Sequence, residues 1–142
     1  MSNVPVFPTY KGRILGIVVL TVAQFLIGSI HVFFGVWLLS ASSSAAFIIS
    51  AQPSLIYSIY TLVFGVLTLI CAYGIWRGKN WGWHGTVAVS LFVIAADALA
   101  LLNLPSIPGI PRLAAVAEIA YSLAVSLYLS QKRVRAKYKV YA

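Results

Sequence analysis

The chain has 142 residues, of which 61% are hydrophobic and only 8% are charged, and its mean hydropathy is +0.96. Soluble domains are about half apolar and about a quarter charged, so the composition excludes a soluble protein and indicates an integral membrane protein. The length allows one domain, residues 1–142, without a separate soluble module. The single cysteine, Cys71, excludes an internal disulfide and any cysteine-based metal or redox motif.

Four apolar segments are long enough to cross a bilayer as helices, which takes about 20 residues. They cover residues 14–40, 53–76, 82–103 and 111–131. All six prolines lie outside these segments or in their first turn. Pro53 and Pro111 suit the first helical position, because its backbone N–H has no partner within the helix. We therefore predict an all-α, four-helix membrane bundle with a basic tail at residues 132–142.

The basic residues predict the orientation of the helices. Nine of the ten lie before the first segment, between the second and third, or after the fourth, and Arg112 alone lies on the other side. Basic loops favour the cytoplasm, so both termini are predicted to be cytoplasmic, in the cell membrane. The net charge of +8 then needs no nucleic-acid partner. We expect the tail to contact anionic lipid headgroups or a protein partner through Lys132, Arg133, Arg135, Lys137 and Lys139.

The only two acidic residues, Asp97 and Glu118, both lie inside apolar segments. At 1.5 Å per residue, Asp97 lies about 9 Å, Glu118 about 10 Å and His31 about 12 Å below the outer surface. Tyr57 and Tyr60 of the second segment lie at the same level. The sequence therefore predicts a polar cluster near the outer end of the bundle, with groups from all four helices.

Small and polar residues recur every three or four positions on three of the segments. Such stripes face other helices rather than lipid, because small residues allow close approach and polar groups bond across the interface. The stripes are Gln24, Gly28, His31 and Gly35; Tyr57, Thr61, Gly65 and Thr68; and Ala114, Glu118, Ser122 and Ser126. They predict that the cluster faces the interior of the bundle.

An acid inside a membrane helix costs about 2.5–3.5 kcal/mol on insertion scales. We expect either acid to be protonated unless it has a cationic partner, and His31 is the best placed, with Arg112 reaching down from the outer end. Three interpretations stay open. The cluster could fix helix register through hydrogen bonds, form a proton, ion or ligand site, or pair with a helix of another subunit. No local motif predicts a metal site.

The stretch between the second and third segments carries Gly74, Trp76, Gly78, Lys79 and Trp81 in the pattern Gly-x-Trp-x-Gly-basic-x-Trp. This pattern resembles the cytoplasmic hinge of small four-span prokaryotic membrane proteins of uncertain function. The scarcity of acids would suit an archaeal membrane. The resemblance implies a four-span fold and no particular activity.

No nucleotide-binding loop, Ser–His–Asp set, cysteine pair or paired metal motif occurs, so we do not expect an enzyme. The sequence favours a non-catalytic accessory or structural subunit of a larger membrane complex, for example an energy-transducing one. One alternative is an autonomous oligomeric carrier or channel-like protein that moves protons, ions or a lipophilic molecule through the cluster. A further alternative is a bundle that binds a lipid or quinone between its helices. The expected partners are the bilayer and other membrane subunits or copies of the chain, and no cofactor is predicted.

Overall fold

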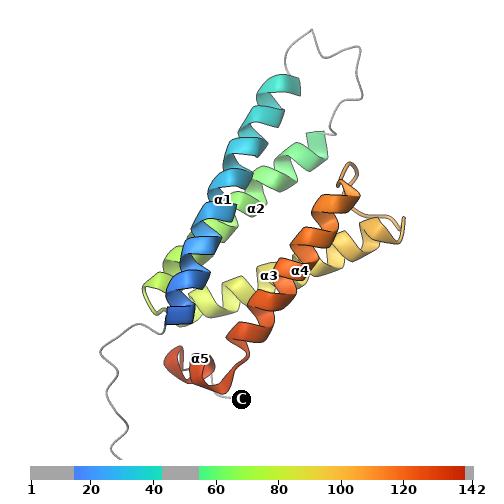
Figure 1. Cartoon of the computed structure of the whole chain (residues 1–142). Coiled ribbons are helices and arrows are strands. Elements are labelled where there is room, and N and C mark those ends of the chain that lie inside the picture. The colour runs from blue at the N-terminus through green and yellow to red at the C-terminus, as the bar shows by residue number, and fades with distance from the viewer. Residues whose placement is uncertain (1–14, 43–54, 140–142) are drawn as a thin grey trace, which may run out of the picture.

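Figure 1 shows a computed structural model of the chain, which describes residues 15–42 and 55–139. Its elements are α1 (Leu15–Ser42), α2 (Leu55–Trp76), α3 (Asn80–Leu101), α4 (Arg112–Leu129) and α5 (Lys132–Lys137). The described part of the chain contains no strand. Helices α1 to α4 are each long and apolar enough to cross a membrane. The predicted all-α fold with four such helices is therefore confirmed.

Most helix ends lie one or two residues from the predicted ones. At both ends of α3, a left-handed backbone residue next to the helix explains the difference. Gly78 has a φ of 67°, and the backbone N–H groups of Gly78 and Lys79 donate to the carbonyls of Ile75 and Gly74. This pattern closes α2 as a Schellman motif and lets α3 begin at Asn80, two residues before the predicted start. Asn103, with a φ of 55°, closes α3 in the same way, so this helix ends at Leu101 rather than at residue 103.

The helices form two antiparallel hairpins, α1–α2 and α3–α4, which are joined by contacts between α2 and α3. In Figure 1 the hairpins meet at the end that holds the α2–α3 turn and spread apart toward the opposite end. Within the first hairpin, a Cβ added to Gly65 would lie 2.7 Å from the backbone nitrogen of Val32. The small-residue stripes therefore bring α1 and α2 together, as small residues do in membrane bundles.

The end of the bundle with the α2–α3 turn and α5 is called the closed end below. A cluster of buried side chains fills it: Ile17, Leu20, Ile75, Val125, Leu129, Val134 and Tyr138. Trp83 Nε1 donates to the carbonyl of Leu129 at 3.0 Å, and the Tyr138 hydroxyl donates to the carbonyl of Ile75 at 3.0 Å. These bonds tie α3 to the end of α4 and α5 to the end of α2.

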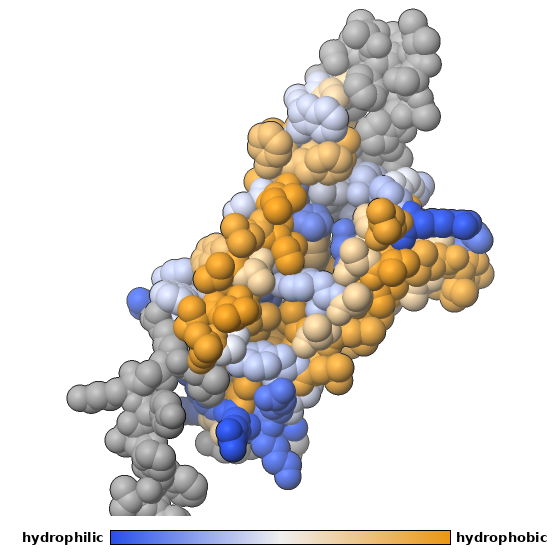
Figure 2. Space-filling view, in the orientation of Figure 1, coloured by the Kyte–Doolittle hydropathy of each residue, from blue (hydrophilic) through white to orange (hydrophobic). Residues whose placement is uncertain are grey.

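The outer surface of α1 to α4 is largely apolar. Large hydrophobic side chains such as Leu15, Phe33, Leu113 and Leu127 are more than two-thirds exposed. Figure 2 shows hydrophobic residues over both hairpins, with hydrophilic atoms recessed in the hollow between them and gathered at the closed end. This surface suits a lipid environment, and it leaves the interior of the bundle as the place where polar chemistry can occur.

Candidate functional site between the two hairpins

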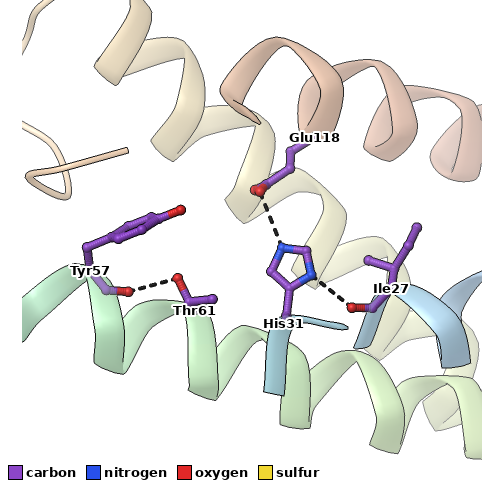
Figure 3. Close-up of polar contacts among 5 residues, drawn as sticks. All are labelled: Ile27, His31, Tyr57, Thr61 and Glu118. Carbon is purple, nitrogen blue, oxygen red and sulfur yellow. Dashed lines mark hydrogen bonds and ion pairs between the residues drawn. The ribbon is translucent and has the colours of Figure 1, made fainter. Parts of the chain in front are cut away.

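His31 lies on α1 and points across the bundle toward α4, as Figure 3 shows. Its Nδ1 atom lies 2.9 Å from the carbonyl oxygen of Ile27, one turn earlier on the same helix. Because a carbonyl oxygen only accepts, Nδ1 carries a hydrogen. The ring of Phe64 on α2 packs edge-on against the imidazole, at a centroid distance of 4.8 Å. The backbone of α1 and this aromatic ring together fix the orientation of the imidazole.

The other ring nitrogen of His31 faces Glu118 of α4. Nε2 lies 3.3 Å from Glu118 Oε1, and the two side chains are 19% and 20% exposed. Since the ring already donates through Nδ1, this second contact is a hydrogen bond only when one proton lies between Nε2 and Oε1. That proton belongs either to a charged imidazolium or to a protonated carboxyl. The pair can therefore hold one mobile proton inside the bundle.

Asp97 of α3 is the third ionisable group of the site, and it is fully buried at 0% exposure. It lies close enough to Glu118 and His31 to interact electrostatically with both. Two carboxylates cannot hydrogen-bond to each other, so with both acids ionised neither carboxyl oxygen of Asp97 has a hydrogen-bond partner within residues 15–42 and 55–139. When one of the two acids is protonated, Asp97 is placed to share a hydrogen bond with Glu118. The two acids can therefore bond only with a proton between them.

A cavity of about 270 Å³ borders this cluster and is called the Glu118 cavity below. Ile27 and His31 line it from α1, Phe64 from α2, and Glu118 with Tyr121 from α4. The ionisable pair thus lies in its wall, partly exposed, while Asp97 is fully buried and does not line the cavity. Such a cavity can admit water or a small ligand to Glu118.

Tyr57 and Tyr60 lie beside the cluster, as the sequence predicts. Both interact electrostatically with Asp97 and Glu118. The Tyr57 carbonyl accepts a hydrogen bond from the Thr61 hydroxyl at 2.9 Å, as Figure 3 shows. The Tyr60 hydroxyl is buried and has no hydrogen-bond partner in the described part of the chain. Groups from all four helices therefore meet at one level, which is what the depths along the helices predict.

Arg112 is not part of the cluster. Its guanidinium Nη2 atom donates to Asn103 Oδ1 at 3.1 Å, and both side chains are exposed. Arg112 is the first residue of α4, so the side chain can turn outward to the α3–α4 connection rather than along the helix toward Glu118. The expectation that Arg112 reaches down to the acids is therefore wrong, and His31 is the basic group next to them.

The basic tail forms α5, which folds back on the closed end. Val134 and Tyr138 are each 1% exposed, so one face of the tail packs into the bundle. Lys132, Arg133 and Lys137 of α5, and Lys139 after it, are exposed, as are Arg77 and Lys79 of the α2–α3 turn at the same end of the bundle. The apolar pair at positions i and i+4 was the sequence signal for this docking. Sequence reasoning read the segment by its charge and missed it.

Sequence reasoning also missed the polar face of α3. Thr86 and Ser90 are buried on the same helix as Asp97. Ser90 lies four residues after Thr86, and Asp97 lies seven residues after Ser90, so the three share one face of α3. Gln24 Nε2 of α1 lies 3.4 Å from Thr86 Oγ1. This stripe matches those on the other three helices and extends the polar interior from Asp97 toward the closed end.

Within the described residues, no group of three His, Cys, Asp or Glu side chains is placed to hold a metal ion. Comparisons with protein-family models, curated proteins and solved structures gave no match. The likeness of the Trp-rich hinge to small four-span prokaryotic proteins therefore stays a prediction, and function has to be argued from the site.

Proposed function

We propose that this protein is a small membrane carrier or channel-like protein that binds and releases a proton at the site formed by Glu118, His31 and Asp97. The observation that carries the proposal is the buried carboxyl of Asp97, which can hydrogen-bond to Glu118 only with a proton between them, next to the His31–Glu118 contact, which needs a proton as well. Ionisable groups inside membrane bundles commonly mark ion and proton pathways. The Glu118 cavity supports access to the site.

The other two interpretations of the acids fit the geometry less well. A cluster that only fixes helix register should satisfy its buried polar atoms without taking up a proton, and the contacts of Asp97 and His31 with Glu118 each need one. A group that pairs with another subunit must be exposed on the bundle surface, and Asp97 is 0% exposed. The cluster is therefore assigned to chemistry within a single bundle, and no enzymatic reaction is proposed.

We propose that both termini face the cytoplasm, in the cell membrane. The exposed basic groups of the turn and of α5 gather at the closed end, and basic segments favour the cytoplasmic side. The same groups are placed to contact anionic headgroups, at about 1 kcal/mol for each basic residue near the surface. In this orientation the Glu118 cavity lies in the outer half of the bundle.

Proton flux in reconstituted vesicles tests the proposal. We expect flux driven by a pH gradient with the native chain and its loss in Asp97→Asn and Glu118→Gln, because an amide cannot take up the proton. Ser126→Ala is the matched control, since it alters a polar residue on α4 outside the Glu118 cavity and should leave flux unchanged. Unchanged flux in the double variant Asp97→Asn/Glu118→Gln would end the proposal.

A second candidate is the accessory subunit of a larger membrane complex. A groove of about 580 Å³ between α2 and α3 supports it, because its lining residues, such as Ile59, Val63 and Phe92, are almost entirely apolar. A neighbouring helix, a lipid or a quinone tail would fit such a surface. Native mass spectrometry after mild extraction from the original membrane separates these outcomes. Larger partners in fixed ratio would favour the accessory subunit. A retained lipophilic molecule would favour a bundle that binds a lipid or quinone. The chain alone, or only with copies of itself, would favour the carrier.

A further inference from the structure

A second, smaller cavity lies near the middle of the bundle and is called the inner chamber below. Its volume is about 10 Å³, which is about the space that one water molecule needs. Gln24 precedes His31 on α1 by seven residues, so the chamber lies about 10 Å from the level of His31, toward the closed end. All four long helices contribute polar side chains to its wall: Gln24 of α1, Thr68 of α2, Thr86 and Ser90 of α3, and Tyr121 and Ser122 of α4.

Three buried polar atoms of this wall have no hydrogen-bond partner in the described part of the chain. They are Gln24 Oε1, Thr68 Oγ1 and the Tyr121 hydroxyl, from three different helices. Gln24 and Thr68 are only 3% and 4% exposed, and buried polar atoms are nearly always hydrogen-bonded. A water molecule both donates and accepts, so one water can donate to the amide oxygen, which only accepts, and bond to a hydroxyl.

The inner chamber is suited to a neutral ligand. The described residues that line it carry hydroxyls, an amide and a thiol, but no acidic or basic group. A cation in an apolar interior is costly unless a carboxylate lies beside it, and neither acid lines the chamber. An apolar molecule would leave the polar atoms unpaired. Size and chemistry therefore both indicate water.

The inner chamber adjoins the Glu118 cavity. Phe64, Tyr121 and Ser122 line both spaces. The two hydroxyl-bearing residues follow Glu118 by three and four positions, which is one helical turn, so they lie on the same face of α4 as the carboxyl. A proton that leaves Glu118 toward the closed end therefore meets these hydroxyls and then the chamber.

Polar groups also continue from the inner chamber toward the closed end. Thr21, which is 1% exposed, lies one turn before Gln24 on α1. Its hydroxyl donates to the carbonyl of Ile17 at 2.7 Å, and its oxygen can still accept a hydrogen bond. Nearer the end of α1, the buried hydroxyl of Tyr128 lies against Gly16. The chamber thus has polar neighbours toward both membrane faces.

We propose that the inner chamber binds one water molecule, and that this water relays protons between the hydroxyls beside Glu118 and the polar groups toward the closed end. The water accepts a proton from one neighbour as it gives one of its own to the next, so it is restored in each transfer and no other reactant is needed. The relay rests on the proposed function and adds the step that links Glu118 to the α5 face. The binding of the water rests on the volume of the chamber and its unpaired atoms alone.

Solid-state NMR of the isotopically labelled chain in lipid bilayers tests the binding of the water. We expect magnetisation to pass from water protons to the side chain of Gln24 in the native chain. Val93 is the internal control, because it is 0% exposed and does not line the chamber, and it should receive none. Thr68→Val removes a partner of the water and should abolish the transfer. Absence of transfer in the native chain, or transfer that persists in Thr68→Val, would overturn the assigned site and leave the proposed function intact.

Proton flux in reconstituted vesicles tests the relay. We expect Thr68→Val to lower the flux about tenfold, which is the effect on a rate of losing about one hydrogen bond. The infrared band of the protonated carboxyl, assigned by its loss in Glu118→Gln, should still respond to pH as in the native chain. Ser29→Ala is the control, since it removes a hydroxyl from an exposed residue of α1 and should leave the flux unchanged. If Thr68→Val does not fold, Gln24→Met removes the amide oxygen instead.

Three results would contradict the relay. Unchanged flux in a folded variant that has lost the water signal would leave the water with a structural role only. Loss of the carboxyl response in Thr68→Val would assign Thr68 to the Glu118 site itself. Absence of flux in the native chain would contradict the proposed function and the relay with it, whereas the NMR result would still decide whether the chamber binds water.

Discussion

At the closed end of the bundle, four helices and α5 meet in a layer of fully buried side chains, and hydrogen bonds from Trp83 and Tyr138 reach backbone carbonyls across helix boundaries. At the level of Glu118, the hairpins have spread, a cavity opens between α1 and α4 beside the His31–Glu118 contact, and ionisable side chains from three helices gather. The contrast teaches that stability and polar chemistry occupy different parts of one small bundle. The closed end holds the hairpins together so that the other part can carry ionisable groups.

The closest approach of two helices in the closed end is at Gly82, and it gives the largest expected effect. A Cβ at this position would lie directly against the backbone of Gly74 and Ile75, which cannot rotate away. We expect Gly82→Ala to lower the free energy of unfolding by about 3 kcal/mol, as overpacking of a tight contact does. Denaturation in detergent, followed by helical circular dichroism, measures it.

Gly85→Ala is the control for this substitution. Its added Cβ would meet the Cys71 sulfur at 2.9 Å, at the end of a side chain that can rotate. We expect a clearly smaller loss, about 1 kcal/mol or less. Helix propensity favours alanine at both positions, so equal losses in the two variants would mean that the backbone contact of α2 and α3 at Gly82 does not determine the effect.

The substitution Asp97→Asn tests the part of the bundle at the level of Glu118. Here we expect a gain in stability rather than a loss. Asp97 is fully buried beside Glu118, and an amide removes the charge that an ionised Asp97 would bring into the apolar interior, so the substitution should relieve a desolvation penalty. We expect the free energy of unfolding to rise by about 1 kcal/mol, measured by the same denaturation, while proton flux is lost. Thr86→Val is the control on α3: it removes the partner of Gln24 and should destabilise the bundle. A loss of stability in Asp97→Asn would instead assign Asp97 to packing.

The difference between the two parts also explains what the sequence could predict. Helix number and the common level of His31, Asp97 and Glu118 follow from length, hydropathy and the rise per residue. Both depend only on positions along the chain, because a segment that crosses an apolar bilayer must be a helix of fixed rise per residue. The His31–Glu118 contact additionally requires the rotation of α1 against α4, which the stripes of small and polar residues restrict but do not determine.

Other features depend on conformations that no periodicity encodes. Arg112 bonds to Asn103 because Asn103 takes a left-handed conformation in the connection between α3 and α4. The Trp83 bond to Leu129 and the docking of α5 depend on where a chain end of about ten residues turns after α4. In these places a few short-range hydrogen bonds compete with solvation, so the charge of the tail predicted contact with lipid headgroups or a partner and did not predict the docking of α5.

The bond from Trp83 to the carbonyl of Leu129 contributes a smaller effect at the closed end. Trp83→Phe keeps an aromatic ring and leaves one of the last carbonyls of α4 without its indole donor. We expect a loss of about 1 kcal/mol in the free energy of unfolding, measured as above. Trp37→Phe is the control, because Trp37 is 52% exposed on α1, and we expect a change within about 0.5 kcal/mol. The assignment fails if the control loses as much as Trp83→Phe.

The smallest effect concerns α5 alone and depends on pH. Burial raises the pKa of Tyr138 to about 12 from its ordinary value of 10.0, and the neighbouring Tyr128 adds a lesser contribution. The docked phenol is therefore neutral over a wider range than the free one. Below pH 10 both are neutral and docking is fully stable; as pH rises from 10 toward 12, the free phenol ionises first and docking is lost. We expect proteolytic cleavage at the basic residues of α5 to accelerate through this interval.

The variant Tyr138→Phe separates this transition from the titration of other groups. It removes the ionisable phenol and the bond to the Ile75 carbonyl, so cleavage of α5 should be somewhat faster at neutral pH and should lose its rise between pH 10 and 12. If the cleavage rate still rises between pH 10 and 12 in Tyr138→Phe, the titrating group is not Tyr138, and its buried phenol does not hold α5 in place. The hydroxyl of Tyr138 bonds α5 to the carbonyl of Ile75 at the end of α2. If the cleavage rate rises between pH 10 and 12 only in the native chain, α5 is the part of the closed end that can detach without unfolding of the four long helices.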